Sequence, residues 1–247
     1  MYTLPILSIG FGNILNFTLF NPVCVLCSAS VNRSISLCSD CENDLPKIGA
    51  CCQQCGLPFN GKQSHTVCGQ CIKVPPAFDY TLSLFHYQMP IDFMVTQLKF
   101  QKKLAYAAIF SHLLLHYKHE KTPQEEKPEA LLPVPLHNKR LIKRGFNQSL
   151  ELSKPLSKAM NIPILRDYVK RSKDTLMQTN LSVVERRKNV KNCFELIKPL
   201  NLKHVVIVDD VLTTGSTCNE LAIILKQAGV EKVGVWSIAR ANFKGRP

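Results

Sequence analysis

The sequence predicts an α/β fold, in which a parallel sheet is flanked by helices, together with a small cysteine-rich module at the N-terminal side. Three observations carry this prediction. Residues 205–208 form a continuous apolar run, and a hydroxyl-rich loop and a helical pattern follow it directly. A strand that is apolar on both faces is typical of a parallel sheet. A second apolar strand and helix lie between residues 131 and 160, and nine of the eleven cysteines precede residue 72.

Length and charge limit the functions to be considered. The 247 residues suffice for one large or two small domains, and an apolar content of 45% allows a substantial core. The formal net charge of +13 is concentrated in residues 136–191, where 14 Lys and Arg stand against 4 Asp and Glu. A basic surface favours diphosphates, nucleic acid or an anionic membrane as partners, although a basic protein without such a partner has the same composition.

Residues 1–23 are expected to form an amphipathic N-terminal segment. A signal peptide has a positively charged region before its apolar region. Here the first basic residue is Arg33, so no such region precedes the apolar stretch of residues 4–20. Polar residues and glycines interrupt this stretch, which makes it too polar to span a bilayer well. We therefore expect a cytoplasmic protein with no transmembrane segment. The N-terminal segment would pack on the body, on a partner or on a membrane surface, so membrane association stays open.

Residues 24–74 are expected to form a zinc-binding module. Four C-x2-C pairs occur here, and each pair makes a tight turn that directs two thiolates at one metal ion. Two pairs complete a tetrahedral site, so the set would hold one or two zinc ions, and both consecutive and interleaved pairing satisfy the spacing. The predicted ligands are Cys24, Cys27, Cys38, Cys41, Cys52, Cys55, Cys68 and Cys71.

Two alternatives to zinc follow from the same cysteines. A disulfide scaffold requires an oxidising compartment, which the missing signal peptide disfavours, and the regular repeat of pairs favours zinc over an iron–sulfur cluster. Cys51 is left over and could replace its neighbour Cys52, whereas His65 is expected at the surface. Cys193 and Cys218 are expected to be small buried apolar side chains. The role expected of the module is structural, because the metal supplies folding free energy that a region of this size lacks.

Residues 75–247 are expected to form the α/β domain, beginning after two consecutive prolines. The apolar pattern predicts, in chain order, strands at residues 80–87 and 131–136 and helices at about residues 90–100, 104–114 and 147–160. Residues 119–129 lack apolar side chains apart from proline and predict a surface loop. Residues 137–148 are strongly basic and predict a loop that meets the strand end and the following helix.

The basic segment is a natural place for the diphosphate part of a ligand. Arg144 is the best candidate for a bidentate phosphate contact, because its planar guanidinium matches two oxygen atoms. Lys99, near the end of the first helix, is expected either to reach the diphosphate or to lie on the helix surface.

The segment after the strand at residues 205–208 suits a sugar phosphate. Asp209 and Asp210 end the strand, and their carboxylates can accept hydrogen bonds from ribose hydroxyls or help to hold hydrated Mg²⁺. Backbone N–H groups, side-chain hydroxyls and the positive end of the following helix can hold a phosphate. The candidate loop residues are Thr213, Thr214, Gly215, Ser216 and Thr217. An ordinary strand-to-helix turn is the competing interpretation.

Residues 205–217, VVIVDDVLTTGST, resemble the phosphoribosyl diphosphate signature of type I phosphoribosyltransferases over 13 contiguous positions. With PVPL, RGFNQ and the paired cysteines, the whole chain resembles the ComF family of competence-related phosphoribosyltransferase-like proteins. Further matches are Leu98-Lys99-Phe100, Gln178 with Leu181, Arg186-Arg187-x-Asn189 and Ala239-Arg240.

This resemblance implies a type I phosphoribosyltransferase fold preceded by a zinc module. It also implies that Asp209 and Asp210 face the ribose and a metal ion, that the loop cradles the 5′-phosphate, that Arg144 meets the diphosphate, and that residues 170–192 form part of a hood. The implied function is binding of phosphoribosyl diphosphate and handling of single-stranded DNA in natural transformation, with competence proteins as further partners. Phe146, Tyr168 and Phe194 are candidates for stacking on bases.

Two other functions stay open. The chain could be a phosphoribosyltransferase with an unknown acceptor, because the acidic pair, the phosphate loops and Mg²⁺ would stabilise an oxocarbenium-like sugar. It could also be a regulator that binds the sugar diphosphate without turnover. The sequence has no recognisable pocket for an acceptor base, so catalysis and the catalytic residues are not assigned.

Overall fold

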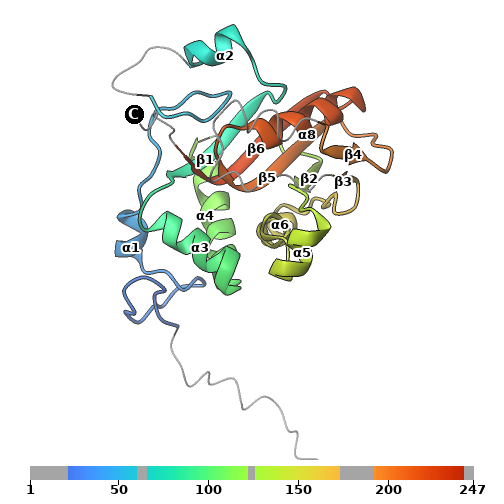
Figure 1. Ribbon diagram of the computed structural model, residues 1–247. Coiled ribbons are helices and arrows are strands. Elements are labelled where there is room, and N and C mark those ends of the chain that lie inside the picture. Colours follow the sequence, from blue (N-terminus) through green and yellow to red (C-terminus); the bar gives the residue numbers. More distant parts are fainter. Residues whose placement is uncertain (1–21, 60–65, 122–125, 173–191, 242–247) are drawn as a thin grey trace, which may run out of the picture.

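The computed structural model describes residues 22–59, 66–121, 126–172 and 192–241. Its centre is a parallel four-stranded sheet in the order β1-β6-β5-β2, with helices on both faces (Figure 1). The strands are β1 (Tyr80–His86), β2 (Ala130–Pro133), β5 (His204–Leu212) and β6 (Lys232–Arg240). The α/β fold with a parallel sheet is therefore confirmed. The predicted amphipathic segment at residues 1–23 lies almost entirely outside the described residues.

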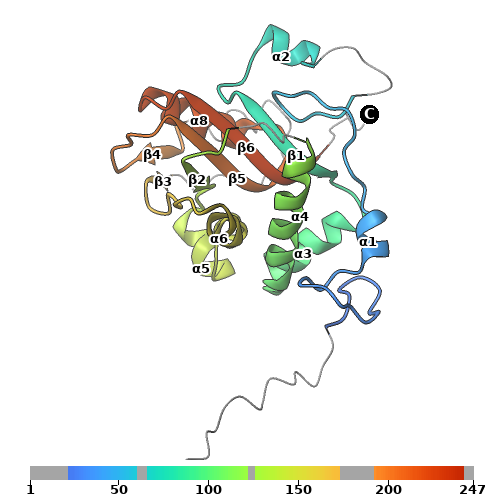
Figure 2. The same ribbon diagram turned by 180° about the vertical axis from the view of Figure 1, so that it is seen from behind.

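The alternation of side chains along the strands explains why both faces are covered. On β5, Val206 and Val208 belong to one buried apolar cluster, and Val205 and Ile207 belong to a second. The first cluster packs against α3 (Ile91–Gln101), α4 (Ala105–Lys121) and α6 (Gln148–Met160). The second packs against α8 (Ser216–Gln227) and against a small antiparallel pair of strands, β3 (Val169–Arg171) and β4 (Phe194–Leu196). Figure 2 shows the same two layers from behind.

Two predicted loops differ from the structure. Helix α4 continues to Lys121, so residues 119–121 are helical. Most of the basic segment is helix α5 (Asn138–Arg144), because its Lys, Arg and Leu residues are good helix formers. The His137 side chain caps α5 by accepting the Lys139 N–H at 3.3 Å, and Gly145 ends it with a φ of 83°.

Strand β5 is longer than its apolar run. Asp209 pairs with Ser237 and Leu212 with Arg240 on β6, so the ladder continues through the acidic pair. Because of this continuation, strand geometry fixes the backbone of Asp209 and Asp210 at the carboxyl end of β5.

The cysteine-rich region lies along the free edge of β1. Residues 46–48 bond to this edge, with the Ile48 N–H donating to Leu84 O at 2.8 Å and the His86 N–H donating to Pro46 O at 2.8 Å. The region contains two short helices, α1 (Ser39–Asn43) and α2 (Gly69–Lys73), which lie at opposite ends of the edge (Figure 1). The division at residues 24–74 and 75–247 stays a proposal. Within the described part of the chain, no helix has both the length and the apolar content needed to cross a bilayer.

Candidate functional site

The eight predicted cysteine ligands lie in two clusters of four. The ligand atoms of each cluster lie within 4.8 Å of one another. The pairing is consecutive rather than interleaved, a choice that the spacing had left open. The first cluster contains Cys24, Cys27, Cys38 and Cys41, and the second contains Cys52, Cys55, Cys68 and Cys71.

The distances within the clusters match a tetrahedral metal site. The Sγ atoms of Cys27 and Cys38 lie 3.7 Å apart, as do those of Cys55 and Cys68. A tetrahedron with Zn–S bonds of about 2.3 Å has an S···S edge of about 3.8 Å, whereas a disulfide bond is about 2.05 Å long. All eleven cysteines are among the described residues, and none of them forms a disulfide. The geometry therefore fits two ions.

Backbone donors prepare the thiols for a metal. The N–H groups of Cys55 and Cys68 point at the Cys52 Sγ at 3.5 Å and 3.3 Å. Burial opposes ionisation of Cys52, but these donors outweigh burial and lower the pKa of its thiol. Cys51 forms an isolated antiparallel β-bridge with Pro58 through its backbone and lies outside the cluster, so it does not replace Cys52. His65 lies outside the described residues. Cys193 and Cys218 are buried among apolar side chains, as expected.

The acidic pair lies at the carboxyl end of β5. Asp210 is only 4% exposed, and its Oδ2 lies 2.6 Å from the Lys99 Nζ in the last turn of α3. Asp209 Oδ1 accepts the Asp210 N–H at 2.9 Å and the Ser149 hydroxyl at 3.4 Å. Three elements therefore converge here: the end of β5, the end of α3 and the start of α6.

The Asp210 carboxylate makes ionisation of Asp209 less favourable. Burial, together with the nearby Asp210 carboxylate, raises the pKa of Asp209 well above its ordinary value of 3.8, and Lys99 only partly opposes this. A divalent cation or a ribose hydroxyl beside the pair would relieve the repulsion. The residues present therefore fit an Mg²⁺ ion held through water or through a ligand.

Arg144 ends α5 on the same side of the site. One Nη1–H donates to Gln148 Oε1, and the guanidinium lies 5.6 Å from the centre of the Phe100 ring. Burial lowers the pKa of Arg144, and the charge of Asp210 opposes the shift. Arg144 was predicted to contact the diphosphate, and Lys99 either to reach the diphosphate or to lie on the helix surface; both interact electrostatically with Asp210.

Ser149 is a site residue that sequence reasoning missed. It lies in the first turn of α6, whose cap Asn147 accepts the N–H groups of Ser149 at 3.0 Å and Leu150 at 3.4 Å. The Asn147 Nδ2 also donates to Val134 O at 3.0 Å, which ties the helix start to the end of β2. The sequence did offer one signal for Ser149. Asn147 stands directly before a helical pattern and is a typical N-cap residue, so it marks the start of the helix that carries Ser149.

The predicted phosphate loop leads into α8. Gly215 has a φ of 76°, a conformation that side chains resist. The Thr214 and Ser216 hydroxyls lie 2.8 Å apart, and the Ser216 N–H points at Thr214 Oγ1 at 3.3 Å. These contacts hold the loop in one shape at the positive end of a 12-residue helix.

Arg240 connects this loop to the second cysteine cluster. It is 7% exposed, and its Nε–H donates to Cys55 O at 2.9 Å. Its Nη1 donates to the carbonyls of Leu212 at 3.1 Å, Ala241 at 2.8 Å and Thr213. In the sequence Arg240 was noted only as part of the family resemblance, because its partners are backbone carbonyls that have no sequence signal.

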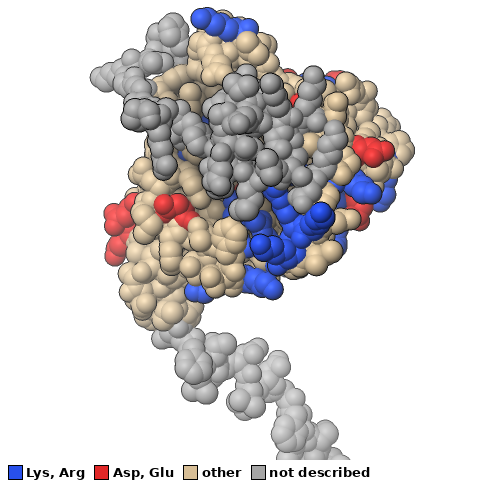
Figure 3. Space-filling model, in the orientation of Figure 1, with Lys and Arg blue, Asp and Glu red and all other residues tan. Residues whose placement is uncertain are grey.

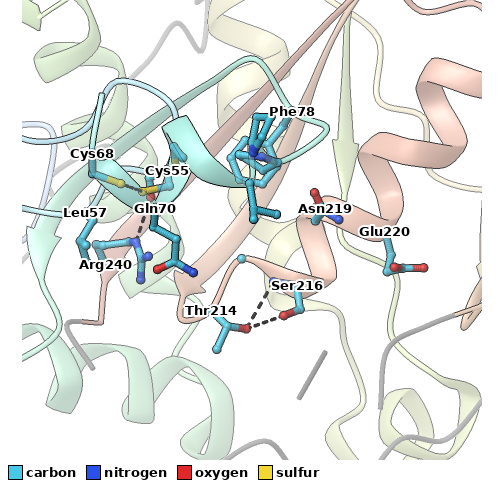
Figure 4. Close-up of a pocket in the computed structure, with 15 residues that line it drawn as sticks. Cys55, Leu57, Cys68, Gln70, Phe78, Thr214, Ser216, Asn219, Glu220 and Arg240 are labelled. Carbon is cyan, nitrogen blue, oxygen red and sulfur yellow. Dashed lines mark hydrogen bonds between the residues drawn. The ribbon is translucent and has the colours of Figure 1, made fainter. Parts of the chain in front are cut away.

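A cavity of about 390 Å³ separates the second cluster from the loop. Figure 4 shows Thr214 and Ser216 below it, Asn219 and Glu220 on α8 to one side, and Cys55, Cys68 and Arg240 on the other.

The candidate stacking residues differ in accessibility. Phe194 is buried beneath Arg171, whose guanidinium lies 5.3 Å from its ring centre, so it is not available for bases. Tyr168 and Phe146 are half-buried. The resembling positions Gln178, Leu181, Arg186, Arg187 and Asn189, and most of the expected hood at residues 170–192, lie outside the described residues.

Comparisons with known proteins agree with this arrangement. Residues 15–72 match a family model described as double zinc ribbon domain, and residues 147–246 match one described as phosphoribosyl transferase domain. Competence protein F of Haemophilus influenzae is 37% identical over 90% of this chain and 98% of that protein. DNA utilization protein YhgH of Escherichia coli O157:H7 is 37% identical over 83% of this chain and 90% of that protein.

More distant similarities were also found. Competence protein ComFC of Bacillus subtilis is 24% identical over 84% of this chain and 90% of that protein. A purine phosphoribosyltransferase from Pyrococcus horikoshii Ot3 is 16% identical, covers 68% of this chain and 95% of its own, and has a TM-score of 0.30, which is too low to bear on the site.

Proposed function

Because the chain belongs to the ComF family of competence proteins, we propose that it binds phosphoribosyl diphosphate at the carboxyl edge of its sheet and acts in the handling of incoming single-stranded DNA. The single observation that carries the first part is the convergence of Lys99, Ser149 and the acidic pair beside the loop before α8. Carboxylates, cations and a helix start meet within one edge of a parallel sheet, where such folds bind ligands.

Each part of the ligand has a partner of suitable chemistry. The loop of residues 213–217, at the start of α8, suits the 5′-phosphate. Asp209 and Asp210 suit the ribose hydroxyls, and Lys99 and Arg144 suit the diphosphate. Mg²⁺ would supply charge neutralisation between the diphosphate and the carboxylates.

The proposed role in DNA handling rests on the relatives and on charge. Two of the relatives are named for competence and one for DNA utilization. Lys139 and Lys143 on helix α5 are exposed, and Figure 3 shows Lys and Arg gathered over the region where Figure 1 places α5. Phosphate contacts from such a face supply affinity without sequence preference.

Turnover is a second candidate function, which the charged environment of the acidic pair favours. Cations at the diphosphate would stabilise the leaving group, and the carboxylates would stabilise an oxocarbenium-like sugar. Release of diphosphate with a panel of nitrogen acceptors separates an enzyme from a binding protein that senses the metabolite.

Titration calorimetry of the zinc-loaded chain with phosphoribosyl diphosphate tests the binding proposal. Wild-type protein should bind, and should bind more weakly without Mg²⁺. The double variant Asp209→Asn with Asp210→Asn should bind at least tenfold more weakly, because ribose and metal contacts lose their charge. Asp167→Asn, on an exposed loop, should bind as wild type does. Equal affinity in all three proteins would contradict the proposal.

A further inference from the structure

Helix α5 turns its apolar side chains toward the solvent. A helix on the surface of a folded protein normally packs its apolar side chains against the core. None of the seven residues of α5 is buried. Its two apolar residues, Leu141 and Ile142, are instead 39% and 83% exposed. Packing within the described part of the chain therefore does not account for the apolar residues of this helix.

The neighbouring end of α3 extends this apolar surface. Phe100 is 58% exposed, and Leu104, just after the helix, is 46% exposed. Phe100 lies beside α5, because the Arg144 guanidinium is 5.6 Å from the centre of its ring. Leu141 stands three residues before Arg144 and thus on the same side of α5. We term Phe100, Leu104, Leu141 and Ile142 the α3–α5 apolar surface. Apolar side chains that gather in this way, unlike single ones, mark interaction sites.

The charge beside the α3–α5 apolar surface is positive. The exposed lysines nearest to it in the chain are Lys102, Lys103, Lys139 and Lys143. The Lys102 Nζ lies 3.5 Å from the position that a Cβ atom of Gly145 would take, so this lysine reaches the end of α5. Residues 93–119 and 130–150 contain no Asp or Glu. A partner that covers this surface therefore needs acidic as well as apolar side chains.

The aliphatic side chains distinguish a protein partner from single-stranded DNA. DNA bases stack on aromatic rings, and phosphates pair with cations. Leu104, Leu141 and Ile142 offer neither contact, so a DNA strand would leave them in water, whereas the apolar side chains of a protein would bury them.

The elements that form the surface indicate the conformation of the partner. The surface is made of α3, α5 and the link after α3, and it has no strand edge to which an extended segment could be added. Proline-rich segments use grooves lined by several aromatic rings, and Phe100 is the one aromatic residue of the four. An amphipathic helix is the recurring mode of peptide recognition that fits an aliphatic surface of this kind.

We propose that the α3–α5 apolar surface binds an amphipathic helix of a partner protein. The apolar side chains of this helix cover Phe100, Leu141 and Ile142, and its acidic side chains pair with the flanking lysines. The interaction needs no phosphoribosyl diphosphate and so goes beyond the proposed function. One consequence does rest on that function: Lys139 and Lys143 are also the lysines proposed to contact DNA, so the partner helix and DNA would exclude each other.

Fluorescence anisotropy of a labelled synthetic peptide with the zinc-loaded full chain tests the proposal. The probe has Leu at positions i, i+3, i+4 and i+7 and Glu or Ala at the other positions. It should bind at least tenfold more tightly than a peptide of the same composition in scrambled order, because only the probe has an apolar face. It should exceed by the same factor a peptide with Lys in place of Glu. Equal affinity for the probe and the scrambled peptide would overturn the proposal.

Ile142→Ser separates the apolar contact from the charge. It should weaken binding of the probe at least tenfold and leave binding of a single-stranded oligonucleotide unchanged. Lys139→Ala with Lys143→Ala should weaken both. Ile197→Ser is the matched control, because Ile197 is 50% exposed after β4, which packs on the opposite face of the sheet from α3. It should bind the probe as wild type does, and equal losses in the two serine variants would overturn the proposal.

The same variant identifies other occupants of the surface. A dimer in sedimentation experiments that Ile142→Ser dissociates would assign the surface to a second copy of the chain. Binding to phosphatidylglycerol vesicles that Ile142→Ser abolishes would assign it to an anionic lipid surface, and loss of oligonucleotide binding would assign it to DNA. Each of these results would overturn the proposal. Absence of oligonucleotide binding by wild type would instead contradict the proposed role in DNA handling, and the peptide comparison would still decide the proposal.

Discussion

At the scale of a single residue, the proposed function and the surroundings of Asp209 make opposite demands. The proposed contact with a ribose or a metal ion needs the carboxylate charged, yet burial and the neighbouring Asp210 raise its pKa to about 7. Burial of unrelieved charge of this kind lowers the stability of the fold and is common at functional sites. The strand ladder to Ser237 holds the residue in place despite that cost.

Stability should therefore depend on pH through Asp209. A carboxyl group with a raised pKa binds its proton more tightly in the folded state, so the free energy of unfolding falls as pH rises from about 3.8 to about 7. Asp209→Asn removes this dependence. In Mg²⁺-free buffer at pH 8 the Tm of the variant should exceed that of wild type, by roughly 2–4 °C for each kcal/mol gained in the free energy of unfolding. This difference in Tm should vanish toward pH 4. A difference in Tm that is constant with pH, or one that Asp167→Asn reproduces, would show that Asp209 carries no such charge.

Arg144 depends on its planar shape. The guanidinium contacts both the Phe100 ring and the Gln148 amide, and an ammonium group cannot make both contacts. Arg144→Lys should weaken phosphoribosyl diphosphate binding about tenfold, measured by calorimetry, although the charge is kept. Arg140→Lys, one turn earlier on α5, should have little effect. Equal affinities in the two variants would place Arg144 outside the diphosphate site.

At the scale of elements, the second cysteine cluster and the phosphate loop form one unit. The Arg240 guanidinium joins the carbonyls of Cys55 and Thr213, so the cluster helps to position the loop. We expect Cys55→Ser to lower both zinc content and the affinity for phosphoribosyl diphosphate. Cys27→Ser should lower zinc content alone, because the first cluster lies at the other end of the β1 edge.

Metal analysis and calorimetry on the same samples check this prediction. Each variant should keep about one of two zinc ions, since each site uses four thiolates. A variant at Arg240 distinguishes the effect of losing its hydrogen bonds from the effect of losing zinc. Arg240→Met should keep both ions and still bind the sugar diphosphate more weakly than wild type. Full affinity in Arg240→Met would show that the loop is positioned without this arginine.

Local patterns predicted some elements well and others poorly. The apolar run before Asp209 and the helix after Gly215 were predicted because burial on both faces and a loop glycine leave clear signals. Helix α5 was predicted as a loop because its basic residues were interpreted as a ligand contact, although they are also good helix formers. Ser149 and Arg240 escaped prediction because their roles depend on contacts between distant segments, and the cavity escaped it for the same reason.

At the scale of the whole molecule, the positive charge should be measurable as salt dependence. Affinity for a labelled single-stranded oligonucleotide should fall with salt, with a slope of log K against log salt of roughly −0.7 for each phosphate contact. Lys139→Ala with Lys143→Ala should reduce the slope by roughly 1.4 if both lysines contact phosphates. Lys127→Ala with Lys203→Ala, two exposed lysines on other loops, should leave it unchanged.

Fluorescence anisotropy with and without saturating phosphoribosyl diphosphate completes this experiment. Competition would place the DNA across Arg144, whereas independent binding would place it elsewhere on the basic surface. Absence of binding even at low salt would contradict direct contact with DNA, and the protein would then have to act through a partner or a metabolite.

The strand order has a consequence for biosynthesis. Strand β6, the last strand among the described residues, lies between β1 and β5 and ends in Arg240, which connects the module to the loop. On the ribosome, the cysteine clusters emerge first and can take up metal early, whereas the sheet cannot close until the last strand has left the exit tunnel. A nascent chain that has taken up metal before β6 emerges would carry filled metal sites while a gap remains between β1 and β5. The proposed ligand site can form only after β6 has been synthesised.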